Sequence, residues 1–195
     1  MLILPLPNSI RYMWNVGSIL GVLIAVQILT GLLLRMHYIS STDLSFGIIN
    51  SMITDLNGGS ILRFIHCNGS RIIFICLYVH IFKGLFYKSF NSNVLTWLSG
   101  RIMYVLLMLI SFLGYVLPWG QIRYWGATVI SSLITTLPVL GNWLLVIVWG
   151  DYRVRSSTLN RFYSLHFIIP FLVLVIILAH LYLSLIHISE PTRHS

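Results

Sequence analysis

The sequence predicts an all-α membrane protein built on a bundle of four transmembrane helices. Of its 195 residues, 57% are hydrophobic and 8% are charged, and the mean hydropathy is +0.90. A soluble globular domain is not this apolar. Four stretches reach the roughly 20 apolar residues that a helix needs to cross about 30 Å of hydrocarbon. The alternating strands of a membrane β-barrel are not seen in the sequence.

The four membrane-spanning helices are expected at about 16–37, 61–87, 97–117 and 158–182. A short interfacial piece containing Trp14 precedes the first span. Thr158 is a candidate N-cap for the last one. Between the third and fourth spans, the apolar runs 124–137 and 143–149 are too short to cross. We expect them to form short interfacial helices.

The polar segment between the first two spans contains Asp43, Asp55 and Gly58, and its turn-forming residues predict a loop. The formal net charge of the chain is +8. Its cations lie near span ends and in loops, where snorkelling and headgroup contact explain them. We therefore expect a lipid bilayer, and no nucleic acid, as the partner of these charges. Because cations occur on both sides, the positive-inside rule does not choose an orientation.

The two cysteines, Cys67 and Cys76, lie nine residues apart in one apolar segment. This spacing argues against a disulfide scaffold, a zinc site and a covalently attached haem.

The end of the chain, residues 183–195, changes character to LSLIHISEPTRHS. Its first eleven residues match the translation of a transposon-end adaptor used in sequencing libraries, and the next codon fits the next adaptor base. We therefore expect 183–195 to be a non-native tail, and 1–182 to form a single transmembrane domain.

Two pairs of histidines share one spacing. His66 and His80 lie 14 residues apart in the second span, and His166 and His180 lie 14 apart in the fourth. Fourteen residues extend about 21 Å along a helix, so each helix carries one imidazole toward either side of the membrane. Left-handed supercoiling brings 14 residues to four whole turns, so both histidines of a helix face the same neighbour.

One span separates the two histidine-bearing helices, so they run parallel. His66 is then expected to pair with His166, and His80 with His180. Two imidazoles on opposite sides of a planar iron cofactor fill both axial positions, which suits electron transfer. The pattern therefore predicts two bis-histidine haems inside a four-helix, haem-binding bundle.

The other two spans carry glycines at the same interval. Gly17 and Gly31 lie 14 residues apart, as do Gly100 and Gly114. Missing side chains allow close backbone approach at the depths of the expected haems. Gly17 and Gly21 also form a GxxxG pattern, for which helix packing is the alternative interpretation.

Two cations flank the histidines of the second span. Arg63 precedes His66 by three residues, and Lys83 follows His80 by three. Either cation is suited to pair with an anionic haem propionate. Snorkelling to lipid headgroups is the alternative.

These residues resemble the cytochrome b family of the quinol:cytochrome c oxidoreductase, over nearly all of residues 5–182. The resemblance lies in successive blocks: WNVGSILG, QILTGLLL, RFIHCNGS, FICLYVHIFKGL, GYVLPWGQ, YWGATVI, TLNRF and HFIIPF. The chloroplast-type relative fits less well. The two histidines of its second pair are one residue farther apart than His166 and His180, and its first helix carries a cysteine for an extra haem. Neither feature is present in this sequence.

The resemblance implies two haem b groups, with His66 and His166 as ligands of the low-potential haem and His80 and His180 as ligands of the high-potential haem. It implies a quinol-oxidising pocket that includes Phe112, Tyr115, Trp125, Gly126 and Ile130. On the opposite side, it places a quinone-reducing pocket near Trp14, Ser18 and Gly21.

The mechanism implied by the resemblance divides the two electrons of quinol. One goes to an iron–sulfur partner, and the other crosses the membrane through both haems to a quinone. The implied partners are ubiquinone and ubiquinol, the Rieske iron–sulfur protein and cytochrome c1, in a dimeric complex. The location is the mitochondrial inner membrane, with a bacterial plasma membrane as the alternative. The full-length family member is the core subunit of a quinol–cytochrome c reductase.

Several residues depart from the family pattern. Lys83 stands where arginine is usual, and Arg71 stands inside the second span where a small residue is usual. Arg123 and Arg155 replace serine and aspartate, and Val146 stands where a glutamate is expected. The second half of the family, with its PEWY loop, is not in the sequence. We therefore expect the chain as written to hold haem without completing catalysis.

Two other functions are compatible with intramembrane histidines and arginines. One is a small transporter or channel that moves protons or ions. The other is a haem-free assembly or structural remnant. A reduced-minus-oxidised absorption spectrum separates the transporter from a haem protein. The remnant is distinguished by whether His66→Leu abolishes one haem while leaving the protein inserted.

Overall fold

The computed structural model describes residues 12–189, and every regular element in that range is helical. Four helices, α1, α3, α5 and α8, are long and apolar enough to cross a membrane, which confirms the predicted fold class. The elements are η1 (Tyr12–Asn15), α1 (Val16–Arg35), α2 (Ser45–Thr54), α3 (Gly59–Phe86), α4 (Ser89–Ser92), α5 (Val94–Val116), α6 (Gln121–Ser132), η2 (Leu133–Thr136), α7 (Gly141–Trp149) and α8 (Ser156–Ser189).

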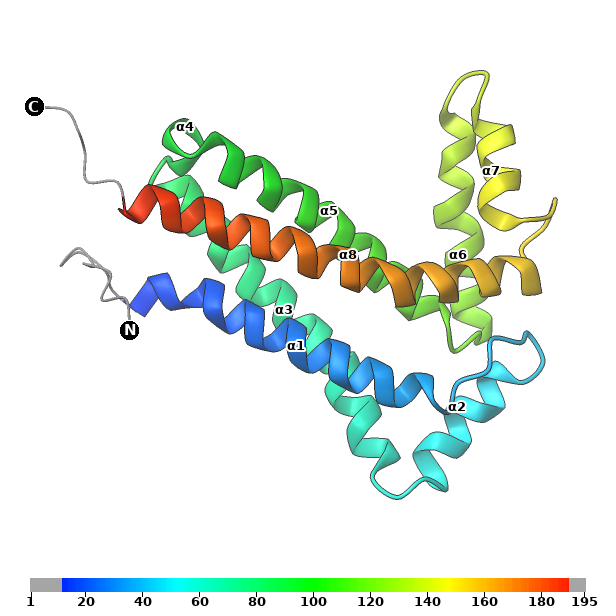
Figure 1. Ribbon diagram of the computed structural model, residues 1–195. Helices are drawn as coiled ribbons and strands as arrows, with labels where there is room; N and C mark the ends of the chain where they lie inside the picture. The colour runs from blue at the N-terminus through cyan, green and yellow to red at the C-terminus, as the bar shows by residue number, and fades with distance from the viewer. Residues whose placement is uncertain (1–11, 190–195) are drawn as a thin grey trace, which may run out of the picture.

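The long helices form two pairs, α1 with α3 and α5 with α8 (Figure 1). Each pair has its own apolar core. Leu20, Ile73 and Leu77 are buried in the first. The second contains Leu113, Val116, Ala127, Phe162, Ile169 and Val173. Large apolar side chains also cover the outer surfaces of the long helices. Lipid solvates such surfaces, so close packing, rather than hydrophobic burial, holds transmembrane helices together.

The segment predicted as a loop between the first two spans contains a helix, α2, so the loop prediction was wrong there. Apolar residues at helical spacing give α2 a face that packs against α3, where Met52 is 3% exposed. Gly58 then turns the chain with a φ of 77°. At Gly59, a Cβ atom would collide with the carbonyl of Met52. The turn-forming residues thus end α2 instead of excluding it.

The two short helices predicted between the third and fourth spans are present as α6 and α7. Helix α6 begins at Gln121, three residues before the expected position, and η2 continues it. In Figure 1, α6 and α7 lie side by side, away from most of the bundle. Trp149 Nε1 donates a 2.7 Å hydrogen bond to Ser131 Oγ. This bond joins the end of α7 to the last turn of α6.

The last transmembrane helix begins at Ser156, so the prediction of Thr158 as its N-cap was wrong. Thr158 lies in the first turn, where its Oγ1 accepts a 3.2 Å bond from the Arg155 N–H. The same hydroxyl donates to the Trp149 carbonyl at 2.9 Å. The helix continues past residue 182 to Ser189. The rest of the predicted tail, 190–195, lies outside the described residues, and its non-native origin stays a prediction.

Tyr38 connects the end of the first span to the end of the third. Its side chain is 8% exposed, and its hydroxyl donates a 2.7 Å bond to the Leu117 carbonyl. Burial raises the pKa of Tyr38, so the phenol stays protonated and keeps donating at neutral pH.

We predict that Tyr38→Phe destabilises the fold by about 1 kcal/mol, because the Leu117 carbonyl loses its donor. Thermal unfolding in detergent measures this as a lower midpoint temperature. Tyr152→Phe is the matched control, because Tyr152 is 83% exposed. Equal midpoints for the two variants would contradict the role of Tyr38.

Candidate cofactor site

The structure brings the four histidines together in two pairs between α3 and α8. The ring centroids of His66 and His166 lie 6.3 Å apart, with an angle of 86° between the ring planes. Those of His80 and His180 also lie 6.3 Å apart, at an angle of 58°. The pairs stand at two depths, 14 residues apart on each helix. The histidines therefore meet across the space between the two helix pairs.

In the α1–α3 pair, each imidazole lies against a glycine. A Cβ atom built on Gly31 would lie 3.0 Å from Cε1 of His66. One built on Gly17 would lie 3.3 Å from Cε1 of His80. The space left by each missing side chain is thus filled by an imidazole of the neighbouring helix.

The α5–α8 pair repeats this arrangement. A Cβ on Gly100 would lie 3.4 Å from Cε1 of His180, an ordinary contact. A Cβ on Gly114 would lie only 2.5 Å from Cε1 of His166, which is a clash. All four glycines of the 14-residue pattern therefore lie opposite a histidine, and Gly114 allows the closest approach.

Hydrogen bonds fix the tautomers of His166 and His66. The Ile110 carbonyl lies 2.9 Å from His166 Nδ1, and a carbonyl only accepts, so Nδ1 carries the proton. Thr30 Oγ1 donates to the Val26 carbonyl at 2.8 Å, so it accepts from His66 Nδ1 at 2.9 Å. Each ring then presents the lone pair of Nε2, as metal-binding histidines do.

The second pair is less symmetric. Ser99 Oγ donates to the Thr96 carbonyl at 2.9 Å and accepts from His180 Nδ1 at 2.9 Å. His80 Nδ1 is buried and has no hydrogen-bond partner among the described residues. Three of the four imidazoles are therefore oriented by a hydrogen bond.

Sequence reasoning missed the hydroxyl groups that orient the histidines, although a signal was present. Thr30 immediately precedes Gly31, and Ser99 immediately precedes Gly100. The glycine places the imidazole next to the helix, and the preceding residue supplies the acceptor. At Gly17, which faces His80, the preceding residue is Val16. This valine explains why α1 offers His80 no hydroxyl.

The ring spacing fits a metal centre with one histidine on each side. Two imidazole nitrogens on opposite sides of one metal ion, each about 2 Å from it, lie about 4 Å apart. The centroids of their rings then lie about 6 Å apart. Within residues 12–189 there is no group of three or more His, Cys, Asp or Glu side chains suited to a metal ion. Each pair therefore offers two imidazoles, which suits a metal-containing cofactor that brings its remaining donors itself.

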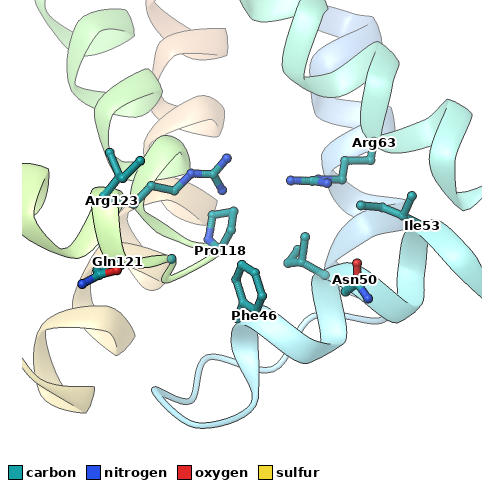
Figure 2. A pocket seen from close by; sticks show the side chains of 10 residues that line it. Phe46, Asn50, Ile53, Arg63, Pro118, Gln121 and Arg123 are labelled. Carbon is teal, nitrogen blue, oxygen red and sulfur yellow. The ribbon is translucent and has the colours of Figure 1, made fainter.

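The two flanking cations lie in different surroundings. Lys83 Nζ is 4.2 Å from the centroid of the Trp14 ring, and the Trp14 ring packs against Tyr87 with centroids 5.3 Å apart. Arg63 lines a cavity of about 420 Å³ and shares it with Arg123. Figure 2 shows this cavity between α2 and the start of α6.

Only part of the expected quinol pocket comes together. A Cβ on Gly126 would lie 4.0 Å from Cε1 of Tyr115. Phe112 instead packs on Phe162, with ring centroids 5.9 Å apart, beside the core of the α5–α8 pair. The other two members of the expected pocket, Trp125 and Ile130, are exposed by 58% and 51%.

The three members of the expected quinone-reducing pocket lie at the start of α1 or just before it, and each has different surroundings. Trp14 packs on Lys83. Ser18 Oγ donates to the Asn15 carbonyl at 2.7 Å, a bond within the start of α1. A Cβ on Gly21 would meet no atom within 4 Å.

Comparison with known proteins places these features in a family. The family model described as Cytochrome b/b6/petB matches residues 1–188. This chain belongs to the cytochrome b/b6 family. It is 44% identical over 179 residues to cytochrome b of Apis mellifera ligustica, an alignment that covers 92% of this chain and 46% of the relative. Cytochrome b of Schizophyllum commune is 46% identical over 178 residues, covering 91% and 46%.

The family fold is also seen in solved structures. The structure titled "Hyperthermophilic respiratory Complex III" matches this chain with a TM-score of 0.89 and 26% sequence identity. The match covers 100% of this chain and 54% of the other. The chain thus spans about half the length of the cytochrome b relatives it matches.

We predict that Gly114→Ala destabilises the bundle by about 1–3 kcal/mol, because the added methyl group displaces the His166 ring. Thermal unfolding of the purified protein measures the loss. Gly47→Ala is the control, since a Cβ there meets no atom within 4 Å. If the two variants unfold at the same temperature, close packing of the His166 ring on Gly114 does not stabilise the bundle.

Proposed function

We propose that this chain binds two haem b groups and carries electrons between them across the membrane. One haem is held by His66 and His166, and the other by His80 and His180. The observation that carries the proposal is the equal 6.3 Å spacing of the ring centroids at two depths. Family membership supports the cofactor.

The roles of the protein side chains follow from their geometry. At each depth, the two facing imidazoles would hold the haem iron. Thr30, Ser99 and the Ile110 carbonyl keep the protons on Nδ1. A haem held by two imidazoles would supply one-electron transfer. Arg63 and Lys83 are proposed to neutralise propionates at opposite ends of the bundle.

In the complete protein, we propose that this transfer is part of quinol oxidation and quinone reduction in the respiratory bc1 complex. Ubiquinone and ubiquinol are the proposed substrates, and the Rieske iron–sulfur protein and cytochrome c1 the proposed partners, in a dimer. The likeness to a respiratory Complex III structure supports this assembly. The proposed location is the mitochondrial inner membrane, with a bacterial plasma membrane as the alternative.

The expected quinone pockets are kept as proposals. A Cβ atom added at Gly126 would reach van der Waals distance of Tyr115 at the junction of α5 and α6, which supports the quinol-oxidising pocket there. For that pocket, Phe112, Trp125 and Ile130 are proposed as further walls. On the other side, Trp14, Ser18 and Gly21 are proposed to lie near the quinone-reducing pocket.

We predict that His66→Leu removes one of the two haems and leaves the other, because leucine offers no ligand. Haem content and the reduced-minus-oxidised spectrum of the purified membrane protein measure this change. His37→Leu is the control, since His37 is exposed beyond the end of α1. If the two variants retain the same haem content, the assignment of His66 is wrong.

A second prediction concerns the hydroxyl that orients His66. Thr30→Val removes the acceptor for His66 Nδ1 and is expected to weaken haem binding at that pair by about 10- to 100-fold. Haem release into excess apomyoglobin, followed by absorbance, measures the change at each site. Thr54→Val, an exposed position in α2, is expected to change neither site. Equal release rates in both variants would exclude an orienting role for Thr30.

A further inference from the structure

The cavity between α2 and α6 has two arginines, and its walls are mostly apolar, with two side-chain amides among them. Its lining includes Phe46 and Ile53 of α2 and Pro118 of the turn after α5. Figure 2 shows the guanidinium groups of Arg63 and Arg123 reaching toward one another from α3 and α6. The cavity thus combines convergent positive charge with an apolar surface.

No acidic side chain lines this cavity. In the part of the chain that the structure describes, the one ion pair is Arg155 with Asp151. Arg63 and Arg123 therefore face each other without a carboxylate between them. Two like charges that converge in this way repel each other unless they share an anion, and planar guanidinium groups bind carboxylate and phosphate in a bidentate manner.

Neighbouring contacts hold Arg123 in place. Its guanidinium carbon lies 5.2 Å from the centroid of the Tyr115 ring, a cation–π contact. Arg63 lies near the start of α3 and Arg123 in the first turn of α6, just beyond the end of α5. Both cations therefore stand at the same end of the bundle (Figure 2).

We propose that Arg63 and Arg123 together bind one oxyanion carried by a membrane-soluble amphiphile. The anionic group is a carboxylate or a phosphate, and the apolar walls accommodate the rest of the molecule. Two sources supply this chemistry. One is the phosphate of an anionic phospholipid. The other is a propionate of the haem at His66 and His166, and this source rests on the proposed function.

The test compares Arg123→Ser with Arg153→Ser in the protein purified from its own membrane. Both variants remove one cation, but Arg153 is exposed and lies outside the cavity. Native mass spectrometry measures phosphatidylglycerol and phosphatidylcholine retained after lipid is added back. Redox titration measures the midpoint potential of each haem. Arg123→Lys is a less disruptive variant, because lysine keeps the charge but lacks the guanidinium group that binds an anion in a bidentate manner.

If a phospholipid is the ligand, Arg123→Ser lowers the affinity for phosphatidylglycerol at least about tenfold. Arg153→Ser leaves this affinity unchanged, and neither variant changes phosphatidylcholine binding. If a propionate is the ligand, Arg123→Ser lowers the potential of one haem only, because a nearby cation stabilises the reduced form. In either case, a double variant with Arg63→Ser loses less than the sum of the single losses, since one anion is shared.

The inference is overturned if Arg123→Ser matches Arg153→Ser in both measurements, or if the two arginine losses simply add. The proposed function fails separately, if the unaltered protein shows no b-type absorption bands. Lipid retention still tests the cavity in that case.

Discussion

The imidazoles of α3 and α8 meet at two depths because both helices carry histidines at the same interval of 14 residues. The rest of the arrangement depends on this meeting. Each ring is placed by a glycine on the partner helix, Gly17 or Gly31 on α1 and Gly100 or Gly114 on α5. The glycines let each helix pair pack closely, while the rings project into the space between the pairs. A four-helix bundle thereby gains two sites, each with an imidazole on either side.

The hydrogen bonds around the rings make the two sites chemically different. The pair His66 and His166 is oriented on both sides, by a threonine hydroxyl and a backbone carbonyl. In the other pair, His180 has a serine partner and His80 has none among the described residues. Because an acceptor that hydrogen-bonds to Nδ1 makes an imidazole more basic, the two pairs would bind a cofactor unequally. Unequal sites suit a pathway in which an electron moves in one direction.

The four spans and the histidine pairs were predictable from the sequence because each rests on a regular interval. Helix length follows from the hydrocarbon thickness, and the parallel course of α3 and α8 follows from the single span between them. The helix α2 was missed because its ten residues lie between turn-forming residues that also suit a loop. Arg71, expected to be costly inside a span, donates to Asn68 Oδ1 at 3.0 Å, one turn away. The convergence of Arg63 and Arg123, sixty residues apart, was beyond sequence reasoning because it depends on where α2 and α6 lie.

The central claim is that both imidazole pairs act as axial ligands of a haem iron. Electron paramagnetic resonance of the oxidised protein tests it directly, because the spin state of ferric haem reports its axial ligands. Two strong-field imidazoles at each iron predict two low-spin ferric signals and no high-spin signal. A high-spin signal at either site, or no haem signal at all, would contradict the account.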